Sequence, residues 1–63
     1  MNVREVLKIL KKDGWYEFSI AGSHMHLKHN VKKGKVTVPV HNGDLAKGTL
    51  KSIFKQAGIT EGI

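Results

Sequence analysis

The sequence predicts an α+β domain in the order helix, strand, strand, strand, helix. Apolar residues recur with helical spacing near both ends of the chain, and central segments alternate between apolar and polar residues. A length of 63 residues allows one small core, so residues 1–63 are expected to form a single domain. Each helix has one apolar stripe and the strands share one apolar face. Both helices should therefore cover the same face of a three-stranded antiparallel sheet.

The first helix is expected over residues 3 to 12. Asn2 and Glu5 have the spacing of a capping box. The apolar residues that follow lie on one helical face: Val3, Val6, Leu7 and Leu10. Gly14 is placed to end this helix in the left-handed conformation.

The first strand is expected over residues 15 to 20, which are rich in aromatic and β-branched types. Base stacking is an alternative role for Trp15, Tyr16 and Phe18, but at least two of them should lie in the core, because so small a domain has few other large apolar groups. The Ala21-Gly22-Ser23 segment then predicts a tight connection to the next strand.

The second strand is expected to begin at His24. Its polar residues share one side, and these are His24, His26 and Lys28. His29 has the parity of the apolar side, but at the frayed end of the strand it should be solvated.

The third strand is expected over residues 35 to 40, with valines on one side and Lys35, Thr37, Pro39 and then His41 on the other. Pro39 lacks an amide hydrogen, which favours either an edge strand or a strand that ends at this residue. The last helix should open at Gly48 and end at Gly58, with Ile59 as a hydrophobic contact after the cap.

Composition narrows the classes of function. The formal net charge is +6 and the sequence pI is near 9.9, so polyanions are the favoured ligands. Without cysteine there is no disulfide scaffold, thiolate nucleophile or thiolate zinc site. No apolar run is long enough to span a bilayer, and the charged first helix is no signal peptide, so a cytoplasmic location without membrane contact is expected.

Four segments together resemble the HicA-type toxins, the RNA-cleaving partners of HicB antitoxins. They are the amphipathic start followed by Gly14-Trp15, the Gly22-Ser23-His24 turn, the strand 36–41 and the segment from Gly48 to Ile59. The resemblance covers nearly the whole chain. The residue after His29 is Asn30, where many relatives are expected to have a proline.

The resemblance implies a double-stranded-RNA-binding-like α-β-β-β-α fold and an endoribonuclease that inactivates messenger RNA. It also implies a HicB-like antitoxin as partner and His24 as the catalytic histidine of the Gly-Ser-His motif. No cofactor and no metal is expected. Gly22 and Ser23 match the motif as well.

Cleavage without metal requires removal of the 2′-hydroxyl proton, stabilisation of charge at phosphorus and protonation of the leaving oxygen. Histidine suits proton transfer because its unperturbed pKa is near neutrality. His24 is expected to act as general base or acid, with His26 or His41 as a second participant. Phosphate contacts are expected from Gly22, Ser23, His26 and the basic hairpin residues Lys28, Lys32, Lys33 and Lys35.

Three alternatives remain at the level of sequence. A non-catalytic RNA-binding module would use the same fold and charge without cutting. His24, His26 and His41 are alternatively a metal site, although no carboxylate in the same run completes the shell. A DNA-binding regulator ranks last, since no helix-turn-helix spacing is recognisable.

Overall fold

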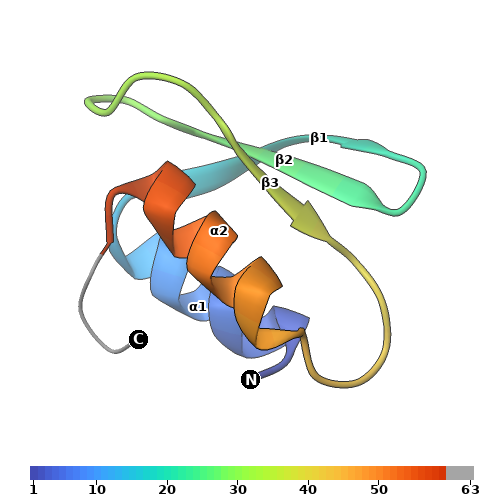
Figure 1. The fold of residues 1–63 in the computed structure, drawn as a ribbon. Helices are drawn as coiled ribbons and strands as arrows, with labels where there is room; N and C mark the ends of the chain where they lie inside the picture. The colour runs from blue at the N-terminus through green and yellow to red at the C-terminus, as the bar shows by residue number, and fades with distance from the viewer. Residues whose placement is uncertain (60–63) are drawn as a thin grey trace.

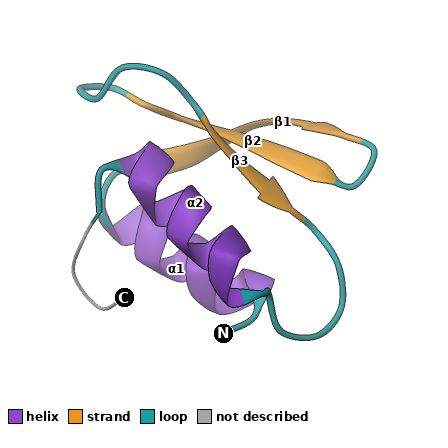
Figure 2. Cartoon of the chain, in the orientation of Figure 1, coloured by secondary structure: helices purple, strands orange, loops and turns teal. Residues whose placement is uncertain are grey.

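The computed structural model describes residues 1–59, so residues 60–63 of the predicted domain lie outside the described part. Its elements follow the predicted order, as Figure 2 shows. They are α1 (Val3–Lys12), β1 (Trp15–Ala21), β2 (His24–His29), β3 (Val36–Pro39) and α2 (Lys47–Ala57). The predicted α+β class is confirmed.

The sheet is antiparallel with the order β1-β2-β3, so β2 is central. Both helices lie on the same face of this sheet, side by side, and leave the other face without a covering element (Figure 1). A shared apolar layer explains this arrangement, because each helix buries one stripe against the one apolar face of the strands. The prediction that both helices share a face is confirmed.

The start and the end of α1 follow from its sequence. The Asn2 side chain accepts from the Glu5 amide at 2.9 Å, and Glu5 accepts from the Asn2 amide at 3.1 Å, which completes the capping box. Gly14 follows the helix with φ at +106°, a conformation that L side chains rarely adopt. An added Cβ at Gly14 would meet the His29 ring at 2.6 Å.

The core forms one cluster between the sheet and the two helices. Trp15 is 2% exposed and is the largest of the fully buried side chains. The remaining buried residues are apolar and come from α1, β2, β3, α2 and one loop: Val6, Leu10, Met25, Leu27, Val36, Val38, Leu45, Ile53, Phe54 and Ala57. Apolar burial of this kind is the main favourable term in folding.

The expectation that at least two of the three β1 aromatic residues lie in the core is wrong. Trp15 is buried, whereas Tyr16 is 44% and Phe18 is 56% exposed. Tyr16 has the opposite parity to Trp15, so it cannot face the helices as well. The core is filled instead by aliphatic residues and by Phe54 of α2.

β3 is an edge strand, as Pro39 predicts. Val36 and Val38 lie on the helix side, opposite Leu27 and Met25 of β2. The outward amide of Thr37 donates to the Gln56 side chain of α2 at 3.2 Å. Pro39 lies two residues further along the same edge, where its missing donor leaves no ladder bond unmade.

α2 ends as the glycine predicts. Gly58 has φ at +69°, and the Ile59 amide donates to the Phe54 carbonyl at 2.9 Å. This six-residue closure is the Schellman motif, and Ile59 packs against the core after it. Among residues 1–59 no helix has the length and apolarity needed to cross a membrane.

Candidate nucleic-acid interface

The sheet face opposite the helices is the candidate site, and we call it the open face. Met25 and Leu27 of β2 point toward the helices and are buried, so the residues between them and around them point the other way. Strand register then places the following side chains on the open face: Tyr16, Phe18, Ser19, Ala21, His24, His26, Lys28, Thr37 and Pro39.

A two-residue hairpin positions His24. Ala21 pairs with His24, so Gly22 and Ser23 alone connect β1 to β2. Gly22 has φ at +61° and Ser23 does not have a positive φ, the pattern of a turn whose first central residue is glycine. The Ser23 carbonyl also accepts from the Val40 amide at 2.6 Å, which ties the turn to the chain after β3.

His24 occupies the entrance of the central strand. It lies in register with Ala21 on one side and with Pro39 on the other. The side chain is exposed, and its ring makes no hydrogen bond within the described residues 1–59. Its imidazole is therefore available to exchange a proton with a ligand on the open face.

His26 lies two residues further along β2, on the same face. It is half-buried, and its Nδ1 hydrogen-bonds the Thr37 hydroxyl of β3 at 3.1 Å. Thr37 holds Nδ1, whereas Nε2 has no hydrogen-bond partner among residues 1–59. The structure thus brings His24 and His26 together on one surface.

Lys28 completes this line of polar residues. Its ammonium lies 4.1 Å from the centroid of the Phe18 ring, a cation-π contact. Phe18 falls at a β-bulge between Glu17 and Ser19, and Tyr16 lies directly opposite Lys28. The bulge places Ser19, opposite His26, on the open face next to Phe18.

The sequence favours the core over base stacking for at least two of the three β1 aromatic residues, so Tyr16 and Phe18 are not among the predicted site residues. One signal was present, because the two share a strand parity opposite to that of Trp15. The bulge itself has no comparable signal in the alternation of β1.

The other basic residues of the hairpin separate into two groups. Lys33 and Lys35 are exposed between β2 and β3. The Lys32 ammonium instead pairs with Asp13 Oδ2 at 2.6 Å and donates to the Ala57 carbonyl at 3.0 Å. Lys32 thus ties the ends of α1 and α2 to the hairpin and does not belong to the open face.

The hydrogen bond from Lys32 lowers the pKa of the Asp13 carboxyl below its ordinary value, with the nearby positive charge acting in the same direction. Asp13 also accepts from the Trp15 indole at 3.2 Å. The carboxylate is therefore part of the structural contact around the helix ends.

His29 is not solvated as predicted. It is half-buried, packs edge-on to Trp15 with centroids 5.1 Å apart, and bonds the Asp13 carbonyl through Nε2 at 2.7 Å. Its Nδ1 accepts the amides of Val31 and Lys32, each at 3.0 Å. Since Nδ1 accepts, Nε2 carries the proton and donates, and the ring is structural.

His41 lies in the loop after β3, outside the sheet. Its Nδ1 donates to the Asn42 carbonyl at 2.9 Å. Within residues 1–59 no three His, Asp or Glu side chains are grouped so that they could hold a metal ion. The alternative metal site formed by His24, His26 and His41 is thus not assembled.

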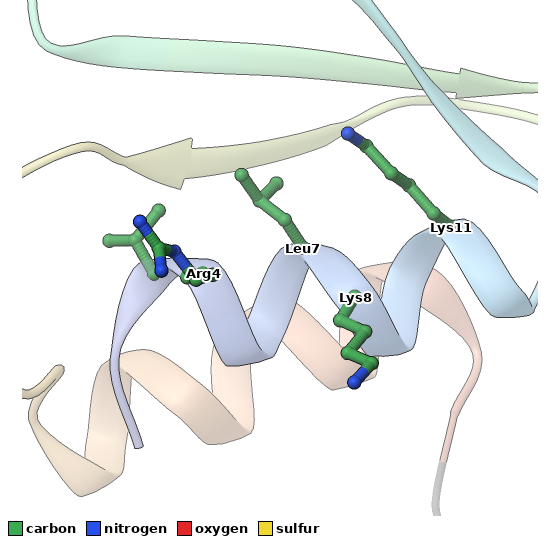
Figure 3. A pocket seen from close by; sticks show the side chains of 5 residues that line it. Arg4, Leu7, Lys8 and Lys11 are labelled. Carbon is green, nitrogen blue, oxygen red and sulfur yellow. The ribbon is translucent and has the colours of Figure 1, made fainter.

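A shallow pocket of about 470 Å³ lies along α1. Its lining is apolar with basic ends: Val3, Arg4, Leu7, Lys8 and Lys11. Figure 3 shows Leu7 and Lys11 pointing from α1 toward the neighbouring strand, with Lys8 pointing away. None of the predicted site residues lines this pocket, so it is separate from the open face.

Comparisons with known proteins agree with this fold. Residues 3–59 match the family model of the HicA toxin of bacterial toxin-antitoxin systems. A solved structure described as a toxin-antitoxin complex from Streptococcus pneumoniae contains a similar chain, with 32% sequence identity and a TM-score of 0.79. The match covers 94% of this chain and 98% of that chain. A search of curated proteins gave no match. Because the family model spans most of the sequence, the chain belongs to the HicA toxin family.

Proposed function

We propose that this toxin is an endoribonuclease that cleaves messenger RNA on the open face, with His24 in proton transfer. The observation that supports this most strongly is the placement of His24. A two-residue hairpin fixes the backbone of His24 at the entrance of the central strand and leaves its imidazole exposed, in a chain of net charge +6. A positioned imidazole is typically worth about 10² to 10⁴ in rate.

The proposed reaction uses the substrate's own 2′-hydroxyl as nucleophile. A base removes its proton, a bond forms between the 2′-oxygen and phosphorus, and the bond to the 5′-oxygen breaks. An acid then protonates the leaving 5′-oxygen, which leaves a 2′,3′-cyclic phosphate and a 5′-hydroxyl. RNA carrying one deoxy sugar at the cleavage position should therefore not be cut there.

Two proton roles call for two groups. His24 and His26 are two residues apart on one face, about 6.6 Å along the strand. His26 is held by Thr37 with its Nε2 edge free, so it is the second participant that we propose. His41 is less suited to this role because it lies in a loop with Nδ1 bonded to its neighbour.

The phosphate contacts that we propose come from the turn and from the basic residues at the open face. Backbone amides at Gly22 and Ser23 border His24, and Lys28 lies on the same face. Lys33 and Lys35 are exposed on the hairpin, where they can approach the same RNA. Their charge would stabilise the phosphorane-like transition state.

A protein antitoxin of the HicB type is the partner that we propose, and it would cover the open face. Charge favours a partner that is acidic where it meets Lys28 and its neighbours. The similar solved chain comes from a toxin-antitoxin complex, which supports the existence of such a partner. A complex in which the antitoxin leaves His24 open to RNA would contradict this part of the proposal.

Growth arrest and RNA integrity in cells test the activity. The His24→Ala variant should lose RNA decay and growth arrest while the purified protein still binds RNA. His41→Ala is the matched control, since it removes an exposed imidazole outside the sheet and should leave both effects intact. Unchanged growth arrest with His24→Ala would favour the alternative, a non-catalytic RNA-binding module of the same fold.

A further inference from the structure

The open face carries two exposed aromatic side chains that the proposed reaction does not use. Tyr16 is 44% and Phe18 is 56% exposed, and both come from β1. Neither contributes to the core cluster, and within residues 1–59 no other element covers their side of the sheet (Figure 1). Large exposed aromatic groups on a basic surface are typical of proteins that stack nucleobases.

Both aromatic residues contact or adjoin the same cation. Tyr16 lies opposite Lys28 in the strand register, and the Lys28 ammonium is 4.1 Å from the Phe18 ring centroid. Phe18 has the same strand parity as Tyr16, and the bulge between Glu17 and Ser19 leaves it without a partner in the register with β2. A ring for a base and a cation for a phosphate therefore lie beside each other.

We propose that Tyr16 and Phe18 form a stacking surface for bases of single-stranded RNA, with Lys28 held at Phe18 to meet the backbone phosphate. This inference rests on the proposed function and names the substrate class of the same face. Bases paired in a duplex have both faces covered by their neighbours, so only an unpaired strand can stack its bases on these rings.

The stacked base is not at the scissile phosphate. Lys28 lies four residues beyond His24 along β2, or roughly 13 Å at about 3.3 Å per residue. An RNA strand that follows β2 would thus be cut at His24 while a base of a neighbouring nucleotide stacks on β1. Charge and aromatic surface would then set where the strand lies relative to His24.

The test measures binding of a short single-stranded RNA by the full chain carrying His24→Ala, so that the RNA is not cut. Tyr16→Ala and Phe18→Ala should each weaken binding by about 5- to 150-fold, the range for one base stacked on one aromatic side chain. Ile20→Ala is the matched control. Ile20 is 60% exposed on the same strand, but its register with the buried Met25 places it on the helix side. The affinity of the Ile20→Ala variant for RNA should therefore not change.

An abasic nucleotide, introduced at one position at a time, shows whether stacking is the cause. At the stacked position an abasic nucleotide should weaken binding by the chain carrying His24→Ala alone. The Tyr16→Ala or Phe18→Ala variant that has already lost this contact should show no further loss of affinity. Tyr16→Phe should bind as the parent does, which separates loss of the ring from a folding defect. Equal losses on intact and abasic RNA, or unchanged affinity after both alanine substitutions, would overturn the inference.

The two proposals fail in different ways. If the chain with His24 intact cleaves RNA but Tyr16→Ala and Phe18→Ala bind normally, the stacking surface alone is wrong. If these variants bind RNA normally but lose the co-expressed antitoxin, the aromatic pair is an antitoxin contact and the inference is again wrong. If the unsubstituted chain neither binds nor cleaves RNA, the proposed function fails with it.

Discussion

The four histidines of this chain have four different surroundings. His24 is exposed without a ring partner among residues 1–59, and His26 is held by the hydroxyl of Thr37. His29 makes three hydrogen bonds and packs on the core tryptophan, whereas His41 bonds only its loop neighbour. Only the first two share the open face, so chemistry is proposed for these two alone.

Gly14 shows how one residue can be fixed by two constraints. Its φ of +106° disfavours any side chain, and an added Cβ would meet His29 Nε2 at 2.6 Å. Gly14→Ala should therefore lower the free energy of unfolding by more than the roughly 1–2 kcal/mol that the backbone conformation costs. The excess reflects displacement of the His29 ring, with about 1 kcal/mol for each hydrogen bond lost.

Gly34→Ala is the matched control in urea unfolding. Gly34 has a similar φ of +83°, but an added Cβ there meets nothing within 4 Å. The Gly34→Ala variant should therefore lose only the roughly 1–2 kcal/mol that the positive φ costs a residue with a side chain. Equal losses for the two variants would show that the contact with His29 does not matter.

At the scale of elements, one ion pair joins three chain segments. Lys32 of the β2-β3 connection contacts Asp13 after α1 and the last carbonyl of α2. The pKa of Asp13 is lowered in the folded chain by the hydrogen bond from Lys32. A carboxyl whose pKa is lower in the folded than in the unfolded chain stabilises the fold at every pH above its unfolded-state pKa. This stabilisation is lost as the pH falls through the folded-state pKa.

Asp13→Asn should therefore flatten the acid side of the stability curve. The difference in free energy of unfolding between the parent chain and this variant should be constant at pH values above the ordinary carboxyl pKa of about 3.8. It should shrink at lower pH. The amide keeps the shape of the carboxylate and can still accept from Trp15. Urea unfolding from pH 6 to pH 2.5 measures this.

Lys32→Gln provides the second arm of this experiment. It should flatten the same pH range, and the double variant should add little, because one interaction is removed in each case. If the free energy of unfolding fell equally with decreasing pH in the parent chain and in Asp13→Asn, the proposed role of this ion pair would be wrong.

For the molecule as a whole, the lysines divide into those that can meet RNA and those that hold the fold. Each phosphate contact to a single strand contributes about 0.7 to the slope of log affinity against log salt. Lys28→Gln should lower this slope by about that amount, measured on single-stranded RNA with the chain carrying His24→Ala. Lys32→Gln should leave the slope unchanged, since its ammonium is bound to Asp13 and Ala57. Equal changes in slope would show that the two lysines do not differ in this way.

Periodicity in the sequence was sufficient for the order of the elements and for their bounds to within one residue. The capping box, the glycine that ends α2 and the edge proline each act through neighbouring residues, so they can be recognised locally. The His24 turn is local as well, since Gly22 and Ser23 alone connect its strands.

The features that were not predicted depend on contacts between distant segments. Lys32 meets a residue 19 positions before it and another 25 positions after it, and His29 bonds a carbonyl 16 positions earlier. The bulge between Glu17 and Ser19 belongs to the pairing of two strands and not to one. Alternation within a segment carries no information on such contacts.

The central claim is that the His24 imidazole moves a proton while RNA is cut. Single-turnover cleavage of one RNA under saturating protein measures this most directly, with His24→Gln beside the unsubstituted chain and His41→Gln as control. The account predicts a rate lower by about 10² to 10⁴ for His24→Gln and an unchanged rate for His41→Gln. Cleavage by His24→Gln at the rate of the unsubstituted chain would contradict it.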